Sequence, residues 1–165
     1  MSARRITEEH AAAAAHSPDG LVIREMIPVD VPTVARLEAE AFTTPWKRDT
    51  FKTLLDRSGA ELWVAELPEH GVVGYYVLWC IQDQGELANI AVREELRGLG
   101  IGSRLLDHVL EIARGRRVGS LYLEVRVSNA RAAAMYASRG FEQIGVRREY
   151  YERPREDARV LMKRL

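Results

Sequence analysis

Three glycines stand close together in the segment Arg97-Gly98-Leu99-Gly100-Ile101-Gly102-Ser103, where the main chain could approach a ligand. The segment lies between an expected strand and a long expected helix, so free N–H groups and the positive end of the helix dipole converge there. These groups favour binding of a phosphate, with Arg97 as an added cation. Ser103 and Leu105 stand where a dinucleotide fingerprint needs its third glycine, and no Lys-Ser or Lys-Thr follows. The alternative is that the glycines only form a tight turn.

The elements expected before this loop form one half of a mixed domain. A strand at 21–26 is followed by a helix whose apolar residues recur at helical spacing, with Asp30 as its expected cap. A second amphipathic stretch ends near Gly59. The apolar period then changes to two, which indicates three strands at 62–65, 72–81 and 87–92. We expect these strands to form an antiparallel meander.

The elements expected after the loop complete the domain. The strongest helix of the sequence begins at Ile101 and ends at Gly115, and its apolar residues form one broad face. A cleanly alternating strand follows at 121–127, and Ser128-Asn129 is expected to cap a helix at 130–139. Strands near 141–148 and 158–162 finish the chain. We predict one mixed α/β domain over residues 21–165, with a mostly antiparallel sheet and about four helices.

Composition limits the classes of function. The 165 residues include 24 basic and 24 acidic side chains, so no global field favours nucleic acid. No apolar run approaches the roughly 20 residues that cross a bilayer, and Glu8 and Glu9 interrupt a start that imitates a signal peptide. We therefore expect a cytoplasmic protein that binds neither nucleic acid nor membrane directly, with residues 1–20 as a flexible tail.

Cysteine and histidine show no pattern of a disulfide or metal site. The single cysteine, Cys80, lies in an apolar run and is expected to be a packed core thiol. The four histidines lack metal-ligand spacing, and His108 is expected on the surface of its helix rather than as a base. We expect no metal.

Several motifs together resemble the GNAT acetyltransferases. Arg97-x-x-Gly100-x-Gly102 after Ile90-Ala91-Val92 is similar to the coenzyme A pyrophosphate loop of that family, and the element order agrees over residues 21–165. Narrower motifs resemble the bacterial ribosomal-protein alanine N-acetyltransferases and the archaeal N-terminal acetyltransferases: Leu123 to Asn129, Met135-Tyr136, Gly140-Phe141, Arg148 to Tyr151, Glu156 to Ala158 and Pro45-Trp46. Gly98 and Ser103 replace residues that are often basic or polar in the family, so fewer side-chain contacts to the pyrophosphate are expected.

The resemblance implies that acetyl-CoA is the co-substrate and indicates which residues contact it. The main chain of Ile90, Ala91 and Val92 would pair with the pantetheine arm as an added strand does. The remaining contacts implied for the coenzyme are Arg97, Gly98, Leu99, Gly100, Ile101, Gly102, Ser103 and Asn129.

Acetyl transfer to an amine needs a base for the amine proton and an acid for the departing thiolate. Glu124 lies mid-strand, opposite the apolar residues, so it could be that base or a solvated residue beside Arg126. Tyr136 follows on the next expected helix, where its phenol, with an ordinary pKa of about 10, could be the acid or only a packed ring. The resemblance implies the catalytic role for both residues.

We predict an enzyme that acetylates the N-terminal α-amine of a protein, by the resemblance an alanine of a small-subunit ribosomal protein. Tyr150 and Tyr151 could line the peptide groove or could be structural. One alternative is an acetyltransferase for a small-molecule amine. The other is an acyl-CoA sensor that no longer catalyses, although such a sensor would need neither Glu124 nor Tyr136.

Overall fold

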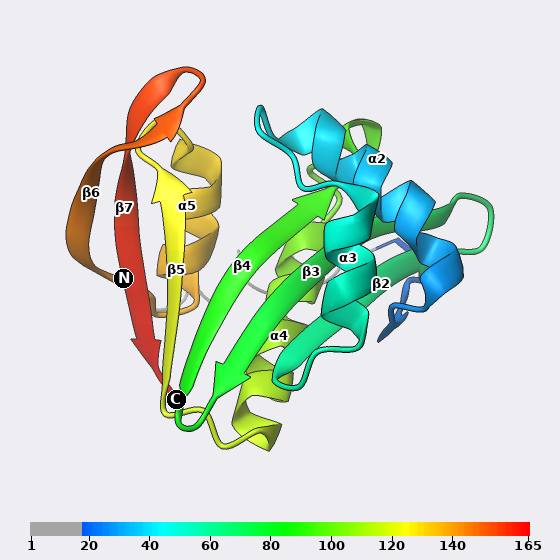
Figure 1. Cartoon of the computed structure of the whole chain (residues 1–165), viewed down its shortest axis with the longest axis horizontal. Helices are drawn as coiled ribbons and strands as arrows, with labels where there is room; N and C mark the ends of the chain where they lie inside the picture. The colour runs from blue at the N-terminus through cyan, green and yellow to red at the C-terminus, as the bar shows by residue number, and fades with distance from the viewer. Residues whose placement is uncertain (1–17) are drawn as a thin grey trace, which may run out of the picture.

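The computed structural model describes residues 18–165 of the protein. Within them, seven strands form one sheet in the order β1-β2-β3-β4-β5-β7-β6 (Figure 1). The strands are β1 (Val22–Glu25), β2 (Ala60–Leu67), β3 (Gly71–Ile81), β4 (Gln84–Val92), β5 (Ser120–Arg126), β6 (Glu142–Glu152) and β7 (Arg155–Arg164). The helices are α2 (Val31–Ala41), α3 (Arg48–Leu55), α4 (Ile101–Gly115) and α5 (Ala130–Ser138), with 3-10 turns η1 (Pro28–Asp30) and η2 (Glu94–Leu96).

The two faces of the sheet carry separate apolar cores. Helices α2 and α3 pack on β2, β3 and β4 from one side, and α4 packs on β3 and β4 from the other. Because side chains alternate along a strand, neighbouring residues of β3 enter different cores. Tyr75 lies in the α2 and α3 core and Tyr76 in the α4 core, and both rings are fully buried.

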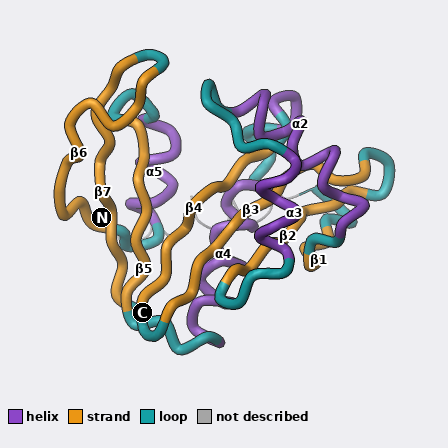
Figure 2. Tube along the Cα trace, in the orientation of Figure 1, coloured by secondary structure: helices purple, strands orange, loops and turns teal. Residues whose placement is uncertain are grey.

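The sheet separates between β4 and β5. These two strands are parallel and are joined through α4, as parallel neighbours require a crossover connection. They pair only from Gln84↔Ser120 to Glu86↔Tyr122 and then diverge, which Figures 1 and 2 show as a V between β4 and β5. Beside this point the register of β4 against β3 shifts, and Ala88 is the extra residue of a bulge. The divergence leaves one edge of β4 open.

The predicted element order and the antiparallel meander are confirmed. Asp30 stands at the N-cap position of α2, as predicted, but its side chain makes no capping hydrogen bond. Asp30 has helical backbone angles, and its carboxylate accepts hydrogen bonds from the Ile27 N–H and from Arg24 instead of capping α2. The final hairpin is also longer than expected. Strand β6 is exposed along most of its length, so it lacks the apolar alternation that marks a strand in sequence.

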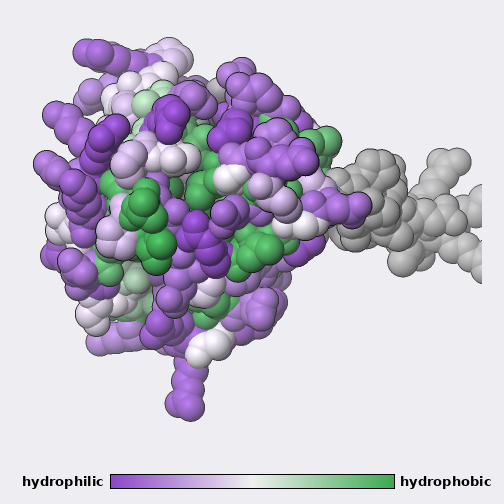
Figure 3. All heavy atoms as spheres, turned by 90° about the vertical axis from the view of Figure 1, so that its right-hand side faces the viewer, coloured by the Kyte–Doolittle hydropathy of each residue, from purple (hydrophilic) through white to green (hydrophobic). Residues whose placement is uncertain are grey.

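Residues 1–17 of the predicted tail lie outside the described residues, and 18–20 form a turn that leads into β1. None of the helices in residues 18–165 is long and apolar enough to cross a membrane. Figure 3 shows the side of the molecule that is on the right in Figure 1, where small apolar areas alternate with hydrophilic side chains. The larger apolar side chains lie mainly in the two cores.

Candidate active site

A cleft of about 770 Å³ opens where β4 and β5 diverge. Its walls are β4, the loop before α4, β5 and α5, and the end of α2 closes one side. Most of the predicted site residues line this cleft: Ile90, Ala91, Val92, Arg97, Gly98, Gly100, Ile101, Gly102, Ser103, Glu124, Asn129, Tyr136 and Tyr151. Leu99 and Tyr150 are the two predicted residues that do not line it.

The glycine loop has the geometry of an anion site. Gly98 and Gly100 both have a φ of 83°, a conformation that side chains rarely adopt. The Gly100 carbonyl accepts the first hydrogen bond of α4, from the Arg104 N–H at 3.0 Å. The main-chain N–H groups of Ile101, Gly102 and Ser103 therefore have no acceptor within the helix and point from its first turn.

Two arginines lie beside this loop. The exposed Arg97 donates from Nε to the carbonyl of Val92 at 3.2 Å, so its guanidinium lies at the rim. Arg131 of α5 lines the cleft, and a Cβ at Gly98 would lie only 2.9 Å from its Nη2. Arg131 has no signal in the loop sequence, because it comes from another element, and it brings a cation to the place where Gly98 offers no side chain.

The open edge of β4 lies beside the loop. Ile90, Ala91 and Val92 pair with Tyr76, Tyr75 and Gly74 of β3, while pairing with β5 ends at Glu86. Strand residues alternate in the edge toward which their N–H and carbonyl groups point, so part of this main chain can pair with an extended ligand. The Val92 carbonyl is already bonded to Arg97.

Glu124 lies on β5 with its side chain 18% exposed. Its Oε1 is 2.9 Å from Nε of Arg147, and it also accepts a hydrogen bond from the Tyr150 hydroxyl, which raises the pKa of Tyr150 to about 12. The neighbour that we expected, Arg126, instead contacts the α2–α3 loop and the β6–β7 turn. The Glu124 carboxylate is thus fixed at the wall of the cleft by Arg147 and Tyr150 and is not freely solvated.

Tyr136 lies on α5, where it is 5% exposed and still lines the cleft. Its ring packs edge-on against Phe141 at 5.7 Å between centroids. Burial, and to a lesser extent the nearby Tyr151, raises the pKa of the Tyr136 phenol above its ordinary value. The phenol therefore stays protonated at neutral pH, as a proton donor must. Packing of the Tyr136 ring and proton donation by its hydroxyl are therefore compatible in this geometry.

Of the other predicted residues, Asn129 and Tyr151 line the cleft, and Tyr150 contacts Tyr151 without lining it. Asn129 caps α5, as predicted, because its side-chain oxygen accepts the Ala132 N–H at 3.2 Å. Tyr151 packs beneath the guanidinium of Arg126, whose carbon is 4.1 Å from the ring centroid, an arrangement that favours a cation–π contact. Tyr150 stacks edge-on against Tyr151 with centroids 5.0 Å apart.

Two expectations outside the cleft are met only in part. His108 is half-buried on α4 rather than fully exposed: its Nδ1 lies 2.8 Å from the Tyr76 hydroxyl, and its ring packs on Trp63. Cys80 is only half-buried at the edge of the core, where burial raises the pKa of its thiol. Among residues 18–165, no three His, Cys, Asp or Glu side chains gather where they could hold a metal ion.

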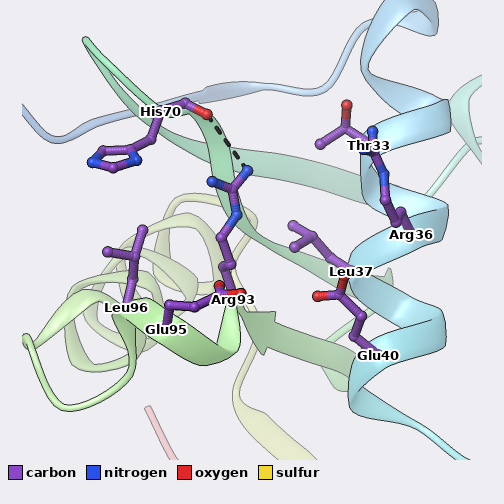
Figure 4. Close-up of a pocket in the computed structure, with 8 residues that line it drawn as sticks. All are labelled: Thr33, Arg36, Leu37, Glu40, His70, Arg93, Glu95 and Leu96. Carbon is purple, nitrogen blue, oxygen red and sulfur yellow. Dashed lines mark hydrogen bonds between the residues drawn. The ribbon is translucent and has the colours of Figure 1, made fainter.

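A second hollow of about 470 Å³ lies between α2 and the segment that follows β4 (Figure 4). It is lined by Thr33, Arg36, Leu37, Glu40, His70, Arg93, Glu95 and Leu96. Its two arginines and two glutamates balance in charge, and Arg93 already donates to the carbonyls of His70 and Val72. It shares only Leu96 with the cleft and contains none of the predicted site residues.

Comparison with known proteins agrees with this geometry. The family described as acetyltransferase (GNAT) matches residues 31–141, most of the chain. The chain belongs to the GNAT acetyltransferase family. It is 34% identical over 135 residues to the [ribosomal protein bS18]-alanine N-acetyltransferase of Escherichia coli K12, covering 80% of this chain and 89% of that protein. The predicted family and enzyme class are confirmed.

Solved structures of GNAT acetyltransferases share the fold. The ribosomal-protein-S18-alanine N-acetyltransferase of Escherichia coli superposes with a TM-score of 0.80 at 30% identity, covering 87% of this chain and 93% of that one. Ard1 of Thermoplasma volcanium gives a TM-score of 0.81 at 26% identity, covering 88% and 98%. The predicted mixed α/β architecture is therefore confirmed.

Proposed function

We propose that this GNAT enzyme transfers the acetyl group of acetyl-CoA to the N-terminal α-amine of a protein that begins with alanine. The observation that carries the proposal is a single cleft that joins an anion-binding loop to a carboxylate and a buried phenol. The relatives named ribosomal-protein alanine N-acetyltransferases support a ribosomal acceptor. We expect the reaction in the cytoplasm, where such an acceptor is made.

The residues that bind the coenzyme divide between main chain and side chain. We propose that the N–H groups of Ile101 to Ser103 hold the pyrophosphate, with Arg97 and Arg131 as cations beside it. The open edge of β4 at 90–92 would bind the pantetheine arm, and Asn129 would contact the coenzyme from the α5 end. The left-handed glycines fit this role, because a side chain at Gly98 or Gly100 would fill the space or strain the loop.

Glu124 and Tyr136 would move the two protons of the reaction. The amine nitrogen attacks the thioester carbonyl carbon, and Glu124 takes the proton that the nitrogen sheds, directly or through a water. The carbon–sulfur bond breaks, and the Tyr136 hydroxyl gives its proton to the departing thiolate. A phenol with the ordinary pKa of about 10 is already protonated at neutral pH, so Tyr136 holds this proton when the thiolate forms.

An α-amine suits this site better than a lysine. An α-amine has a pKa of about 7.7–8.0 and a lysine about 10.4, so about one N-terminus in ten is neutral at pH 7 but fewer than about one lysine in a thousand. Because part of the α-amine is already neutral, a single half-buried carboxylate is a sufficient base for the proton that the nitrogen sheds. The acceptor would enter between the end of α2 and Tyr151, which line the same cleft.

The test is a panel of acceptors incubated with acetyl-CoA and followed by mass spectrometry. Peptides that begin with alanine or serine should be acetylated at the α-amine, with a kcat/KM well above that of internal lysines or spermidine. The Tyr136→Phe protein is the matched control for non-enzymatic transfer. A higher kcat/KM for spermidine or another small amine would replace the proposal with the small-amine alternative. Coenzyme binding without any transfer would favour the sensor.

A further inference from the structure

A fully buried carboxylate lies outside the residues assigned above. Glu38 of α2 is 1% exposed, and its oxygens accept hydrogen bonds from three separate segments. Asn89 Nδ2 lies 2.8 and 2.9 Å from the two oxygens, the Trp46 N–H lies 3.1 Å from Oε1, and the Tyr75 hydroxyl donates to Oε2.

All three of these donors are uncharged. Burying a carboxylate costs several kcal/mol unless hydrogen bonds or an opposite charge compensate it, and the contacts of Glu38 are hydrogen bonds only. By contrast, the buried Glu61 on the other face of the sheet is paired with Arg116 and bonded to Trp63. An apolar residue at position 38 would fill the core without this desolvation cost. Core packing alone therefore does not explain a glutamate at this position.

Two of the three donors belong to the acceptor end of the cleft. Asn89 lines the cleft and directly follows Ala88, the bulge residue of β4, at the place where β4 and β5 diverge. Trp46 belongs to the α2–α3 loop, residues 42–47, which begins with the cleft residue Phe42. Glu38 therefore joins two walls that would contact the incoming amine. The third donor, Tyr75, lies in the core.

We infer that Glu38 is a positioning residue that fixes the α2–α3 loop against the β4 bulge and so sets the width of the acceptor entrance. The inference rests on the proposed function only in taking this end of the cleft as the acceptor side. Glu38 is too deeply buried to touch a substrate, so it acts through Asn89 and the loop. None of the hydrogen bonds that Glu38 accepts from Asn89, Trp46 and Tyr75 involves the glycine loop that would bind the pyrophosphate.

The test compares Glu38→Met with Glu38→Gln. Methionine fills the space but accepts no comparable hydrogen bonds, so the loop should loosen and the KM for the acceptor should rise about tenfold or more, as expected for loss of hydrogen bonds to a charged group. The KM for acetyl-CoA should stay within about twofold. Glutamine keeps an oxygen for Asn89 and Trp46, while the Tyr75 hydroxyl can turn to accept from its amide, so this variant should restore most of the acceptor KM.

A second readout does not depend on activity. Amide hydrogen exchange of residues 42–47 should accelerate in Glu38→Met and return toward the wild-type rate in Glu38→Gln. Glu61→Gln is the matched buried-carboxylate control, and Tyr75→Phe removes only the core donor. Both controls should lower thermal stability without moving the acceptor KM or the exchange of this loop. If Glu38→Met does not fold, Glu38→Asp shortens the reach by one carbon and should give a smaller effect in the same direction.

The inference is overturned if the variants raise both KM values equally, if neither KM changes, or if Glu61→Gln gives the same acceptor effect. The acceptor in these assays is whichever amine the wild-type protein acetylates best. A wild-type preference for a small amine would therefore end the proposal of an alanine acceptor while leaving the test of Glu38 intact.

Discussion

In the proposed reaction, the two sides of the cleft would contribute by different means. On the β1–β4 side, the main chain offers the contacts: two left-handed glycines, the free N–H groups of α4 and the open edge of β4. On the β5–β7 side, side chains offer them, and these are held by ion pairs and ring contacts such as Glu124 with Arg147 and Arg126 over Tyr151. The affinity for a ligand held by main-chain groups depends on the backbone conformation, whereas the rate of a proton transfer depends on single side-chain atoms.

A change of backbone at the glycine loop should have the largest effect. In Gly100→Glu, a side chain is forced into the left-handed conformation at the start of α4, and its carboxylate repels phosphates from the same N–H groups. We expect acetyl-CoA binding to fall below detection by calorimetry, while circular dichroism shows a folded protein.

Gly115→Glu is the matched control for this loss. Gly115 lies at the other end of the same helix, and a Cβ there would meet no atom within 4 Å. The Gly115→Glu protein should bind acetyl-CoA with the affinity of the wild type. Normal affinity in a folded Gly100→Glu protein would remove the glycine loop from the coenzyme site.

Removal of one oxygen on the β5–β7 side should act on rate and not on binding. Tyr136→Phe keeps the ring that packs on Phe141 and deletes the proton donor, so kcat should fall by roughly 10² to 10⁴. Coenzyme affinity should remain within about twofold of wild type. Tyr122→Phe, a half-buried tyrosine of β5 outside the cleft, should leave kcat unchanged. An unchanged kcat in Tyr136→Phe would leave only a packing role for this ring.

The contrast between main-chain and side-chain contacts also explains which parts of the site could be predicted from the sequence. The glycine loop, the cap at Asn129 and the strong helix at 101–115 depend on residues within a few positions of one another, so spacing predicts them. Arg147 reaches Glu124 across 23 positions and Arg126 reaches Thr43 across 83, contacts that no local period encodes. The sequence does contain one signal for Glu38: it lies at helical spacing from Val31 and Val34, on the face that otherwise holds apolar residues.

Loss of the base should have a smaller effect than loss of the acid, and one that depends on pH. In Glu124→Gln, kcat/KM at pH 7 should fall by about 10², the low end of the range for general acid–base catalysis, because no carboxylate takes the amine proton. The deficit should narrow above about pH 8, where most of an acceptor with an α-amine pKa of about 7.7–8.0 is already neutral. Glu142→Gln, on the exposed strand β6, should follow the wild-type pH profile. A pH-independent deficit in Glu124→Gln would show that Glu124 is not the base.

The smallest effect should come from an ion pair far from the cleft, where stability changes but catalysis does not. Asp30 is 6% exposed and lies 2.8 and 2.9 Å from two nitrogens of Arg24. Burial alone would raise the pKa of Asp30, but hydrogen bonds from Arg24 and the Ile27 N–H outweigh it and lower the pKa. A carboxyl whose pKa is lower in the folded state stabilises the fold above its unfolded pKa of about 4 and loses that contribution as pH falls further.

Asp30→Asn should therefore cost about 1.5–3 kcal/mol of unfolding free energy at pH 7, the range for hydrogen bonds to charged groups. The difference from wild type should shrink as pH falls below about 4, because the unfolded wild-type chain then binds a proton at Asp30 that the folded ion pair disfavours. Chemical denaturation at pH 7 and pH 3 measures both values, and the exposed Asp49→Asn should change stability by less than about 0.5 kcal/mol. Because Asp30 joins only β1 and η1, kcat/KM should not change. A constant stability difference at both pH values would mean that the loss comes from packing rather than from the ionised pair.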